Sequence, residues 1–264
     1  MTIKGLIAGL ALMLLAVGAP ANAQDRAFRH KVYDSSVQLY ILEPDQNDSS
    51  KLFDNPACTA TAFEKTPKGY HLLTAAHCVV NEHKGLFTWD EVAPDGTLSI
   101  TTGDPGNVDH TPATVLMVGN WHDGWDVAVL NVETTTVIPV IPLGDDTKLE
   151  MGDKIVSVSA PNGGEIKYWF EGYVSAAHHQ IDELLGHQVR SWQNSTFIQL
   201  PGFPGSSGAS VVSVDQQAII GIYTSDVSEG FPPYQRIAGA MTPVSVVKEF
   251  IANPKLHLNL DPKK

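Results

Sequence analysis

The sequence predicts an all-β protein, because many short strand-like runs with turn signals between them are typical of barrels and sandwiches. Runs of β-branched or alternating apolar residues recur along the chain, and Gly, Pro, Asn and Asp separate them. The segment Glu133–Thr147, rich in Thr, Pro and Asp, divides these runs into two groups and is typical of a linker. The clearest runs are Ser36–Leu42, Leu98–Thr102, Ala113–Val118, Val127–Val132, Lys154–Ser159, Ile166–Ser175, Val189–Gln199, Ser210–Val214 and Ala218–Thr224.

One helix is predicted near the C-terminus. Thr242 suits the N-cap position and Pro243 suits the first helical position, where its missing N–H costs nothing. Apolar residues then recur on one helical stripe between Val244 and Ile251. The sequence therefore predicts a C-terminal helix that packs one face on a β core.

Composition and charge exclude some classes of function. The chain has 264 residues, with 17 Lys+Arg against 29 Asp+Glu, a formal net charge of −12 and 43% hydrophobic residues. This composition is ordinary for a globular protein. The negative balance argues against nucleic-acid binding and against docking on anionic lipid, which both need basic surfaces. We therefore expect neither nucleic acid nor a membrane as a partner of the mature protein.

The first 23 residues have the three parts of a secretory signal peptide. Lys4 gives a positive start, Gly5–Val17 is apolar, and Ala21–Ala23 offers a small-x-small cleavage site. The alternative, an uncleaved membrane anchor, is disfavoured because the apolar run is short for a membrane span. Cleavage after Ala23 would leave a chain that begins at Gln24, so we expect a periplasmic or secreted protein.

The chain has two cysteines, Cys58 and Cys78. In an oxidising compartment two cysteines usually pair. The apolar runs Ala60–Phe63 and Tyr70–Ala76, joined by the turn-like Thr66–Gly69, would form a hairpin that brings them together. A pair of buried free thiols is the alternative. We predict a disulfide between Cys58 and Cys78.

A histidine and an aspartate stand at the ends of apolar strands. His77 follows the apolar end of one run and is adjacent to Cys78, whose disulfide would fix the imidazole in place. Asp126 directly precedes Val127–Val132 and could accept a proton-bearing nitrogen of His77. The alternatives are a structural histidine and a solvated aspartate. Fixed placement is what a general base requires, so we regard both residues as candidates for catalysis.

A third candidate lies in a loop of small residues. Ser207 is flanked by Ser206 and Gly208, directly before an apolar strand, where a tight loop can expose its hydroxyl. Glycines such as Gly205 let backbone N–H groups converge on an oxyanion. A flexible Gly/Ser loop is the alternative. The elbow of α/β-hydrolases is excluded, because Ala209 stands where that motif has its second Gly and the chain order is His, Asp, Ser.

Taken together, the blocks Thr74–Cys78, Asp126–Leu130 and Gly205–Ser210 resemble the three signatures of trypsin-like (chymotrypsin-fold) serine proteases. The single cysteine pair and Ser206, which replaces an acid of the animal digestive members, make the chain more similar to the bacterial secreted members. The resemblance covers nearly the whole mature chain. It implies two antiparallel six-stranded β-barrels and a C-terminal helix, with the active site between the barrels.

Together with the linker-like segment Glu133–Thr147, the resemblance predicts a division of the chain. After the predicted signal peptide, residues 1–23, residues 24–140 would form the N-terminal barrel that carries His77 and Asp126, and residues 141–264 would form the C-terminal barrel that carries Ser207. In this family Ser207 would be the nucleophile, His77 the general base and Asp126 its orienting partner. The backbone N–H groups of Gly205 and Ser207 would form the oxyanion hole. Neither a metal nor a cofactor is expected.

The same resemblance indicates where substrate would bind. Pro201, Gly202, Thr224, Ser225 and Asp226 fall at positions that line the substrate pocket in the family. Pro201 stands where relatives that cut after basic residues carry Asp, which argues against a trypsin-like preference. We expect a monomeric endopeptidase acting on protein or peptide. The alternatives are a catalytically inactive binding or regulatory homologue, and an esterase that uses the same three residues.

Overall fold

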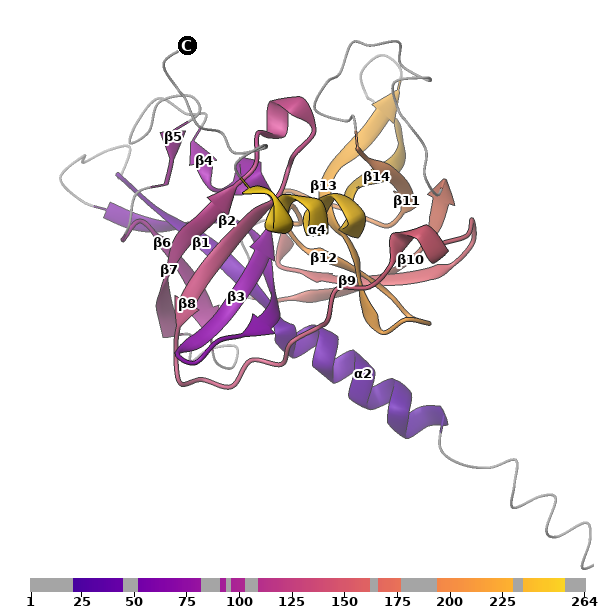
Figure 1. The fold of residues 1–264 in the computed structure, drawn as a ribbon, viewed down its shortest axis with the longest axis horizontal. Helices are drawn as coiled ribbons and strands as arrows, with labels where there is room; N and C mark the ends of the chain where they lie inside the picture. Colours follow the sequence, from indigo (N-terminus) through magenta and orange to yellow (C-terminus); the bar gives the residue numbers. More distant parts are fainter. Residues whose placement is uncertain are drawn as a thin grey trace, which may run out of the picture.

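The computed structural model describes residues 21–44, 52–81, 91–93, 96–102, 109–161, 166–176, 194–229 and 235–254. Its strands form two closed antiparallel barrels of six strands each, which lie side by side (Figure 1). The predicted all-β class with two six-stranded barrels is therefore confirmed. A helix closes the described part of the chain, as the sequence predicted.

The first barrel has the strand order β1-β2-β3-β8-β7-β6. Its register sets apolar side chains opposite one another, as in the pair Leu72 and Leu130 of β3 and β8. Two further short strands, β4 and β5, pair with each other outside the barrel. The strands are β1 (Ser36–Pro44), β2 (Leu52–Lys65), β3 (Gly69–Thr74), β4 (Val80–Asn81), β5 (Glu91–Val92), β6 (Leu98–Thr102), β7 (Asp109–Val118) and β8 (Ala128–Glu133).

The second barrel has the strand order β10-β11-β14-β13-β12-β9. The segment between β8 and β9, where the sequence predicted a linker, contains only a short 3₁₀ helix, η3 (Asp146–Lys148), and an isolated bridge. Of the predicted strand Val189–Gln199, β11 covers the last four residues, and 189–193 lie outside the described residues. The strands are β9 (Lys154–Ser159), β10 (Tyr168–Ala176), β11 (Thr196–Gln199), β12 (Ser210–Ser213), β13 (Ala218–Glu229) and β14 (Gln235–Pro243).

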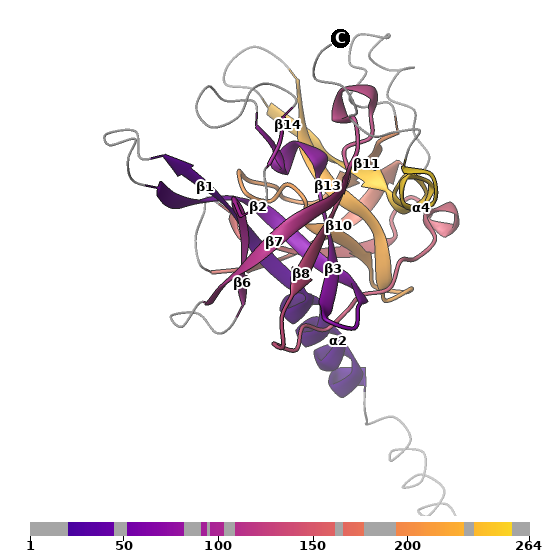
Figure 2. The same ribbon diagram turned by 60° about the vertical axis from the view of Figure 1, so that its left-hand side comes forward.

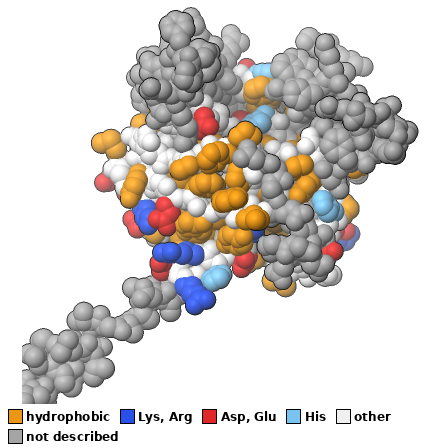
Figure 3. Space-filling model, turned by 180° about the vertical axis from the view of Figure 1, so that it is seen from behind, with side chains coloured by type: hydrophobic (Ala, Val, Ile, Leu, Met, Phe, Trp, Pro, Cys, Tyr) orange, Lys and Arg blue, Asp and Glu red, His pale blue; other side chains and the backbone are white. Residues whose placement is uncertain are grey.

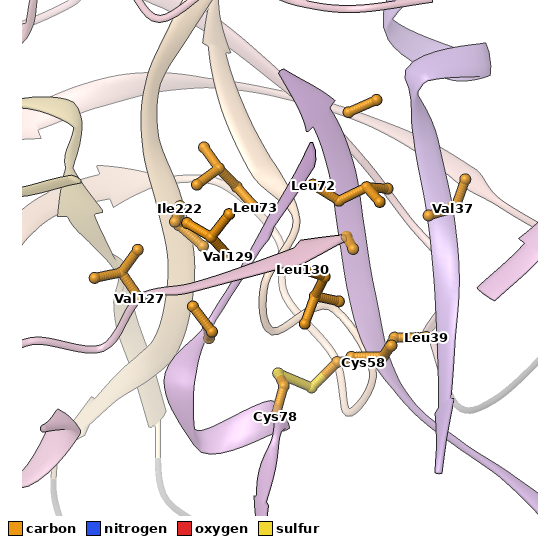
Figure 4. Packing of buried hydrophobic residues seen from close by; sticks show 14 of the residues in the cluster. Val37, Leu39, Cys58, Leu72, Leu73, Cys78, Val127, Val129, Leu130 and Ile222 are labelled. Atoms are coloured by element: carbon orange, nitrogen blue, oxygen red, sulfur yellow. A yellow bond between two sulfur atoms is a disulfide. The ribbon is translucent and has the colours of Figure 1, made fainter. Parts of the chain in front are cut away.

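One hydrophobic cluster extends from the first barrel into the second. Leu72, Leu73 and Leu130 of the first barrel are fully buried, and Ile222 of β13 belongs to the same cluster (Figure 4). The disulfide between the buried Cys58 and Cys78 lies at its edge, with a Cα–Cα distance of 6.0 Å. The shared core holds the two barrels together, and the disulfide joins β2 to the 3₁₀ helix η1 (Ala76–Cys78) that follows β3.

The C-terminal helix α4 (Val244–Ala252) packs on β13, β14 and η3. Its buried stripe is Val244, Val247 and Phe250, in agreement with the predicted periodicity. The start of the helix differs from the expectation: Thr242 still belongs to β14, and Pro243 is the N-cap without a side-chain hydrogen bond. The Thr242 hydroxyl instead donates to the carbonyl oxygen of Asp126 at 3.4 Å, because β14 lies against the segment before β8.

A second helix, α2 (Ala21–Ser35), was not predicted. It lies below the barrels and leads into β1 (Figure 2). Phe28 and Val32, one helical turn apart, are buried in the main cluster. Residues 1–20 of the expected signal peptide lie outside the described residues. None of the helices described is long and apolar enough to cross a membrane.

Lys167, which lies between β9 and β10 of the second barrel, holds the C-terminal end of α2. Its Nζ donates to the carbonyl oxygens of Tyr33 at 2.6 Å and Ser36 at 2.7 Å. The same ammonium lies 4.3 Å from the centroid of the Tyr33 ring. The last carbonyls of a helix lack partners within it and attract cations, so Lys167 attaches α2 to the second barrel.

Aromatic side chains occupy part of the molecular surface. Seen from behind, hydrophobic side chains gather across the middle of the face, while most of the visible basic ones lie toward its lower left (Figure 3). Tyr168 and Phe203 are among the exposed large hydrophobic residues, and the ring of Phe170 lies 5.9 Å from that of Phe203. These contacts attach the loop that carries Phe203 to β10.

Burial makes the stability of the fold depend on the charge of Lys167. Desolvation lowers the pKa of Lys167 from its ordinary value of 10.5 to about 8, partly offset by the Asp34 carboxylate. Between these values the unfolded chain binds more protons than the folded one, so stability rises with pH. We expect Lys167→Met to remove this dependence, which amounts to about 3 kcal/mol.

Urea denaturation at a series of pH values measures this effect. The free energy of unfolding of the wild type, relative to Lys167→Met, should rise as the pH is raised from about 8 to about 10.5. Lys68, whose side chain is 75% exposed, offers the control replacement Lys68→Met, which should leave the pH dependence of the wild type unchanged. A constant difference between the wild type and Lys167→Met would contradict the prediction.

Candidate active site

His77 projects from a short rigid segment at the end of β3. The strand ends at Thr74, and the 3₁₀ helix η1 (Ala76–Cys78) follows at once. Ala75 and Ala76 are fully buried, and Cys78 is fixed by the disulfide. The small side chains let the backbone pack closely, while the His77 side chain keeps 26% of its surface exposed.

Asp126 binds His77 through both of its carboxylate oxygens. Oδ2 lies 2.7 Å from His77 Nδ1, and Oδ1 accepts the backbone N–H of His77 at 3.0 Å. The Asp126 side chain is only 10% exposed, so its charge is held away from bulk water and compensated by these two contacts. The indole of Trp121 lies edge-on to the imidazole, with ring centroids 6.4 Å apart. The imidazole is thus held from two sides.

Ser207 lies in a turn that two glycines make possible. Gly205 and Gly208 have φ values of 92° and 82°, which L-residues with a side chain rarely adopt. The N–H of Ser206 donates to the carbonyl oxygen of Phe203 at 2.8 Å, closing the turn. In the described part of the chain, no hydrogen bond has the N–H of Gly205 or Ser207 as its donor. Two neighbouring backbone donors therefore remain available on the turn.

The turn at residues 203–208, here called the Ser207 turn, packs on the first barrel. Thr59 of β2 donates its N–H to the carbonyl oxygen of Ser207 at 2.9 Å and its hydroxyl to that of Gly205 at 2.9 Å. A Cβ added to Gly208 would overlap the hydroxyl of Thr74 and lie 3.0 Å from the backbone nitrogen of Ala75. The Ser207 turn therefore packs directly against the segment that leads into His77, although 130 positions separate the two in the sequence.

The predicted substrate-binding residues lie on two segments beside Ser207. Pro201, exposed, and Gly202 precede the turn, and Thr224, Ser225 and Asp226 belong to β13. The Ser207 hydroxyl lies 3.5 Å from the carbonyl oxygen of Thr224. Ser225 Oγ is buried without a hydrogen-bond partner among the described residues, while Asp226 is exposed.

Sequence reasoning missed the polar residues that hold the turn. Ser206 is 3% exposed; its Oγ lies 2.9 Å from Ser159 Oγ and accepts the N–H of Phe203 at 3.2 Å. Thr61 Oγ1 of the first barrel accepts the N–H of Ser210, which belongs to the second barrel, at 3.3 Å. The signal that the sequence offered was the pair Thr59 and Thr61, two hydroxyl residues that alternate with alanines directly after Cys58.

Cys58, His77 and Cys78 form a group whose potential ligand atoms lie within 4.8 Å of one another. Zinc and similar ions require cysteine as thiolate. Both sulfurs of this group are joined in the disulfide, so in this form the group offers a metal only the imidazole.

A comparison with known families shows to which family the chain belongs. The model of the trypsin-like peptidase domain family matches residues 58–222, which include His77, Asp126 and Ser207. The chain belongs to this family. A search of curated proteins found no match.

The two-barrel fold of this trypsin-like peptidase domain also has solved counterparts. One is a structure described as "HtrA-type protease AlgW with decapeptide", with a TM-score of 0.64. The alignment covers 88% of this chain and 68% of that chain, at 17% sequence identity. At this identity the likeness concerns the fold.

The close packing of Gly208 against Thr74 can be tested by adding a single methyl group to the glycine. We expect Gly208→Ala to destabilise the protein by about 2 kcal/mol more than Gly152→Ala, because overpacking adds roughly 1–3 kcal/mol to the backbone strain. Gly152 is a matched control: its φ is 96°, and an added Cβ there meets nothing within 4 Å. Chemical denaturation of both variants measures the difference. Equal losses would mean that the turn does not depend on this contact.

Proposed function

We propose that the protein is a secreted serine endopeptidase that uses Ser207, His77 and Asp126 as a catalytic triad. The observation that carries the proposal is the two-point contact between Asp126 and His77, at 2.7 and 3.0 Å. This contact fixes the imidazole with Nδ1 toward the carboxylate, leaving Nε2 as the nitrogen that can accept a proton. A merely structural histidine has no need for a buried carboxylate on both its ring and its backbone.

In this mechanism Ser207 Oγ attacks the carbonyl carbon of the scissile bond while its proton passes to His77 Nε2. To do so, the hydroxyl gives up its contact with the Thr224 carbonyl oxygen. Asp126 stays ionised and stabilises the imidazolium that forms. His77 then gives the proton to the leaving amine, and water, activated by the same imidazole, hydrolyses the acyl-enzyme.

The oxyanion of the tetrahedral intermediate would bind to the N–H groups of Gly205 and Ser207. Both groups lie on one turn and are not used by other described residues. Donors fixed before the reaction need no reorganisation when the charge develops, which makes them effective. The bonds from Thr59 to the carbonyls of the same two residues support this assignment, because they hold the turn in one orientation.

The proposal extends to substrate, location and organisation. A solved structure of the same fold is described with a decapeptide, which supports a peptide or protein substrate here. The signal-like residues 1–23 support export to the periplasm or the medium. We retain residues 24–140 and 141–264 as the two barrel domains, Pro201, Gly202, Thr224, Ser225 and Asp226 as substrate-binding residues, and a monomer that needs no cofactor.

An alkyl fluorophosphonate, which reacts with activated serines, tests the proposed nucleophile. We expect stoichiometric labelling of the wild type by intact-mass analysis and none of Ser207→Ala. Ser210→Ala is the matched control, because this buried hydroxyl three residues away has no hydrogen-bond partner among the residues that the structure describes, and its loss should leave labelling unchanged.

Hydrolysis of casein and of a peptide library, measured on the same samples, identifies the reaction. Labelling together with peptide cleavage supports the endopeptidase. Labelling with ester hydrolysis but no peptide cleavage would favour an esterase. A folded wild-type protein that does not react with the probe would be an inactive homologue, contrary to the proposal.

The orienting role of Asp126 gives a separate prediction. Asp126→Asn keeps the size of the side chain but cannot stabilise the imidazolium, so kcat should fall about 10⁴-fold with little change in KM. Peptide hydrolysis under initial-rate conditions measures both constants, and circular dichroism checks that the variant is folded. A loss of less than about tenfold would contradict the role given to this carboxylate.

A further inference from the structure

Two segments flank Ser207 and define the region that receives the side chain next to the scissile carbonyl. We call residues 201–205 and 223–226 together the P1 region, P1 being the substrate residue whose carbonyl is attacked. The N–H of Gly208 donates to the carbonyl oxygen of Tyr223 at 2.8 Å, and the N–H of Tyr223 donates to that of Ala209 at 2.8 Å. These bonds place Tyr223 directly beside the turn that carries Ser207, and residues 201–205 lead into the same turn, so we expect the P1 side chain to enter between the two segments.

The side chain of Tyr223 already occupies the space between these segments. Its hydroxyl donates to Asp226 Oδ1 on one segment. On the other segment it packs on Gly202 so closely that a Cβ added there would overlap the hydroxyl and the ring. Tyr223 thus bridges both walls of the P1 region.

The ring has no room to move aside. Tyr223 is 3% exposed and belongs to the core cluster of the second barrel, together with Leu200 and Met241. Packing in a protein interior is close to that of organic crystals, so a side chain held in this way keeps one rotamer. Tyr223, which fills the P1 region, is therefore part of the core of the second barrel.

The backbone of β13 supports this arrangement. The register with β14 shifts between Tyr223 and Ser225, so Thr224 forms a bulge. Bulges re-aim neighbouring groups and occur often beside active sites. Here the Thr224 carbonyl turns toward Ser207, at 3.5 Å, while the Thr224 hydroxyl donates to the carbonyl oxygen of Ala240 at 3.2 Å.

We propose that Tyr223 is the specificity-determining residue, and that its ring restricts the enzyme to substrates with a small P1 side chain, such as Ala, Ser, Thr or Val. The inference rests on the proposed function, because it names the substrate class of that site. Aromatic and long aliphatic P1 side chains would overlap the ring. Lys and Arg would overlap the ring for the same reason, and Oδ1 of Asp226 is already engaged by the tyrosine hydroxyl.

Peptidyl diphenyl phosphonates that differ only in P1 provide the test, because they react with the serine through the same site as a substrate. We expect the second-order rate of inactivation of the wild type to be at least about tenfold higher with P1 Ala or Val than with P1 Phe, Leu or Lys, since a misfit in an apolar site costs one to two orders of magnitude. The peptide library should give the same ranking.

Three variants separate the volume of the ring from its hydroxyl. Tyr223→Phe keeps the ring and should keep the preference for small P1 residues. Tyr223→Ala and the less drastic Tyr223→Val remove the ring, and should raise the rate with P1 Phe or Leu by about tenfold or more. If Tyr223→Ala does not fold, Tyr223→Val and the wild-type profile still decide the question.

A fluorophosphonate without a P1 group, applied first, separates this inference from the proposed function. Absence of fluorophosphonate labelling in folded wild type would overturn the proposed function and this inference with it. Labelling combined with fastest inactivation by a large P1 residue would overturn the inference alone. The same holds if Tyr223→Val leaves the P1 ranking unchanged, since the ring would then not limit the P1 residue.

Discussion

The geometry of the candidate site depends on the hydrogen bonds of Thr59. It is fully buried in β2, and all its polar groups are used. Its carbonyl oxygen accepts the hydroxyl of Thr74, its N–H donates to Ser207, and its hydroxyl donates to Gly205 and accepts the N–H of Ala160. One residue of the first barrel therefore holds the histidine segment, the serine turn and the second barrel together.

The glycines of the serine turn follow from this constraint. Hydrogen bonds to the carbonyls of Gly205 and Ser207 fix the direction of both peptide units, so the N–H groups of Ser206 and Gly208 point away from Thr59, toward Phe203 and Tyr223. The backbone reaches that arrangement only through positive φ values at Gly205 and Gly208. Gly208 must also lack a side chain for a second reason, because a Cβ there would overlap the hydroxyl of Thr74. Conformation and close packing thus demand the same residue type.

Sequence reasoning was most accurate where a signal is local. The alternating run Leu98–Thr102 and the run Lys154–Ser159 have the observed bounds of β6 and β9, since period-two alternation and flanking turn residues suffice to define a strand. The candidate site residues stood in short blocks with a known family pattern, and the structure brings the blocks together. Their chemical roles belong to the proposed function.

What the sequence did not indicate depends on contacts between distant residues. The first half of α2 is largely polar, and the contacts that bury Phe28 and bind the helix end come from strands formed later in the chain. Likewise, nothing near Tyr223 in the sequence shows that its hydroxyl reaches Gly202, because that approach depends on how the turn before Ser207 folds back on β13. Local periodicity carries no information about such pairs.

The attachment of α2 has a consequence for the order of folding. The helix comes before every strand that the structure describes, yet its end is bound by Lys167, 134 positions after Tyr33. Contacts of such sequence separation form late, since a long loop must close first. During synthesis from the N-terminus, β1 and β2 are therefore made early enough to contact α2, whereas Lys167 reaches the C-terminal end of the helix only once the second barrel has been made. The attachment of the end of α2 is thus among the last contacts to form, and it requires both barrels to be present.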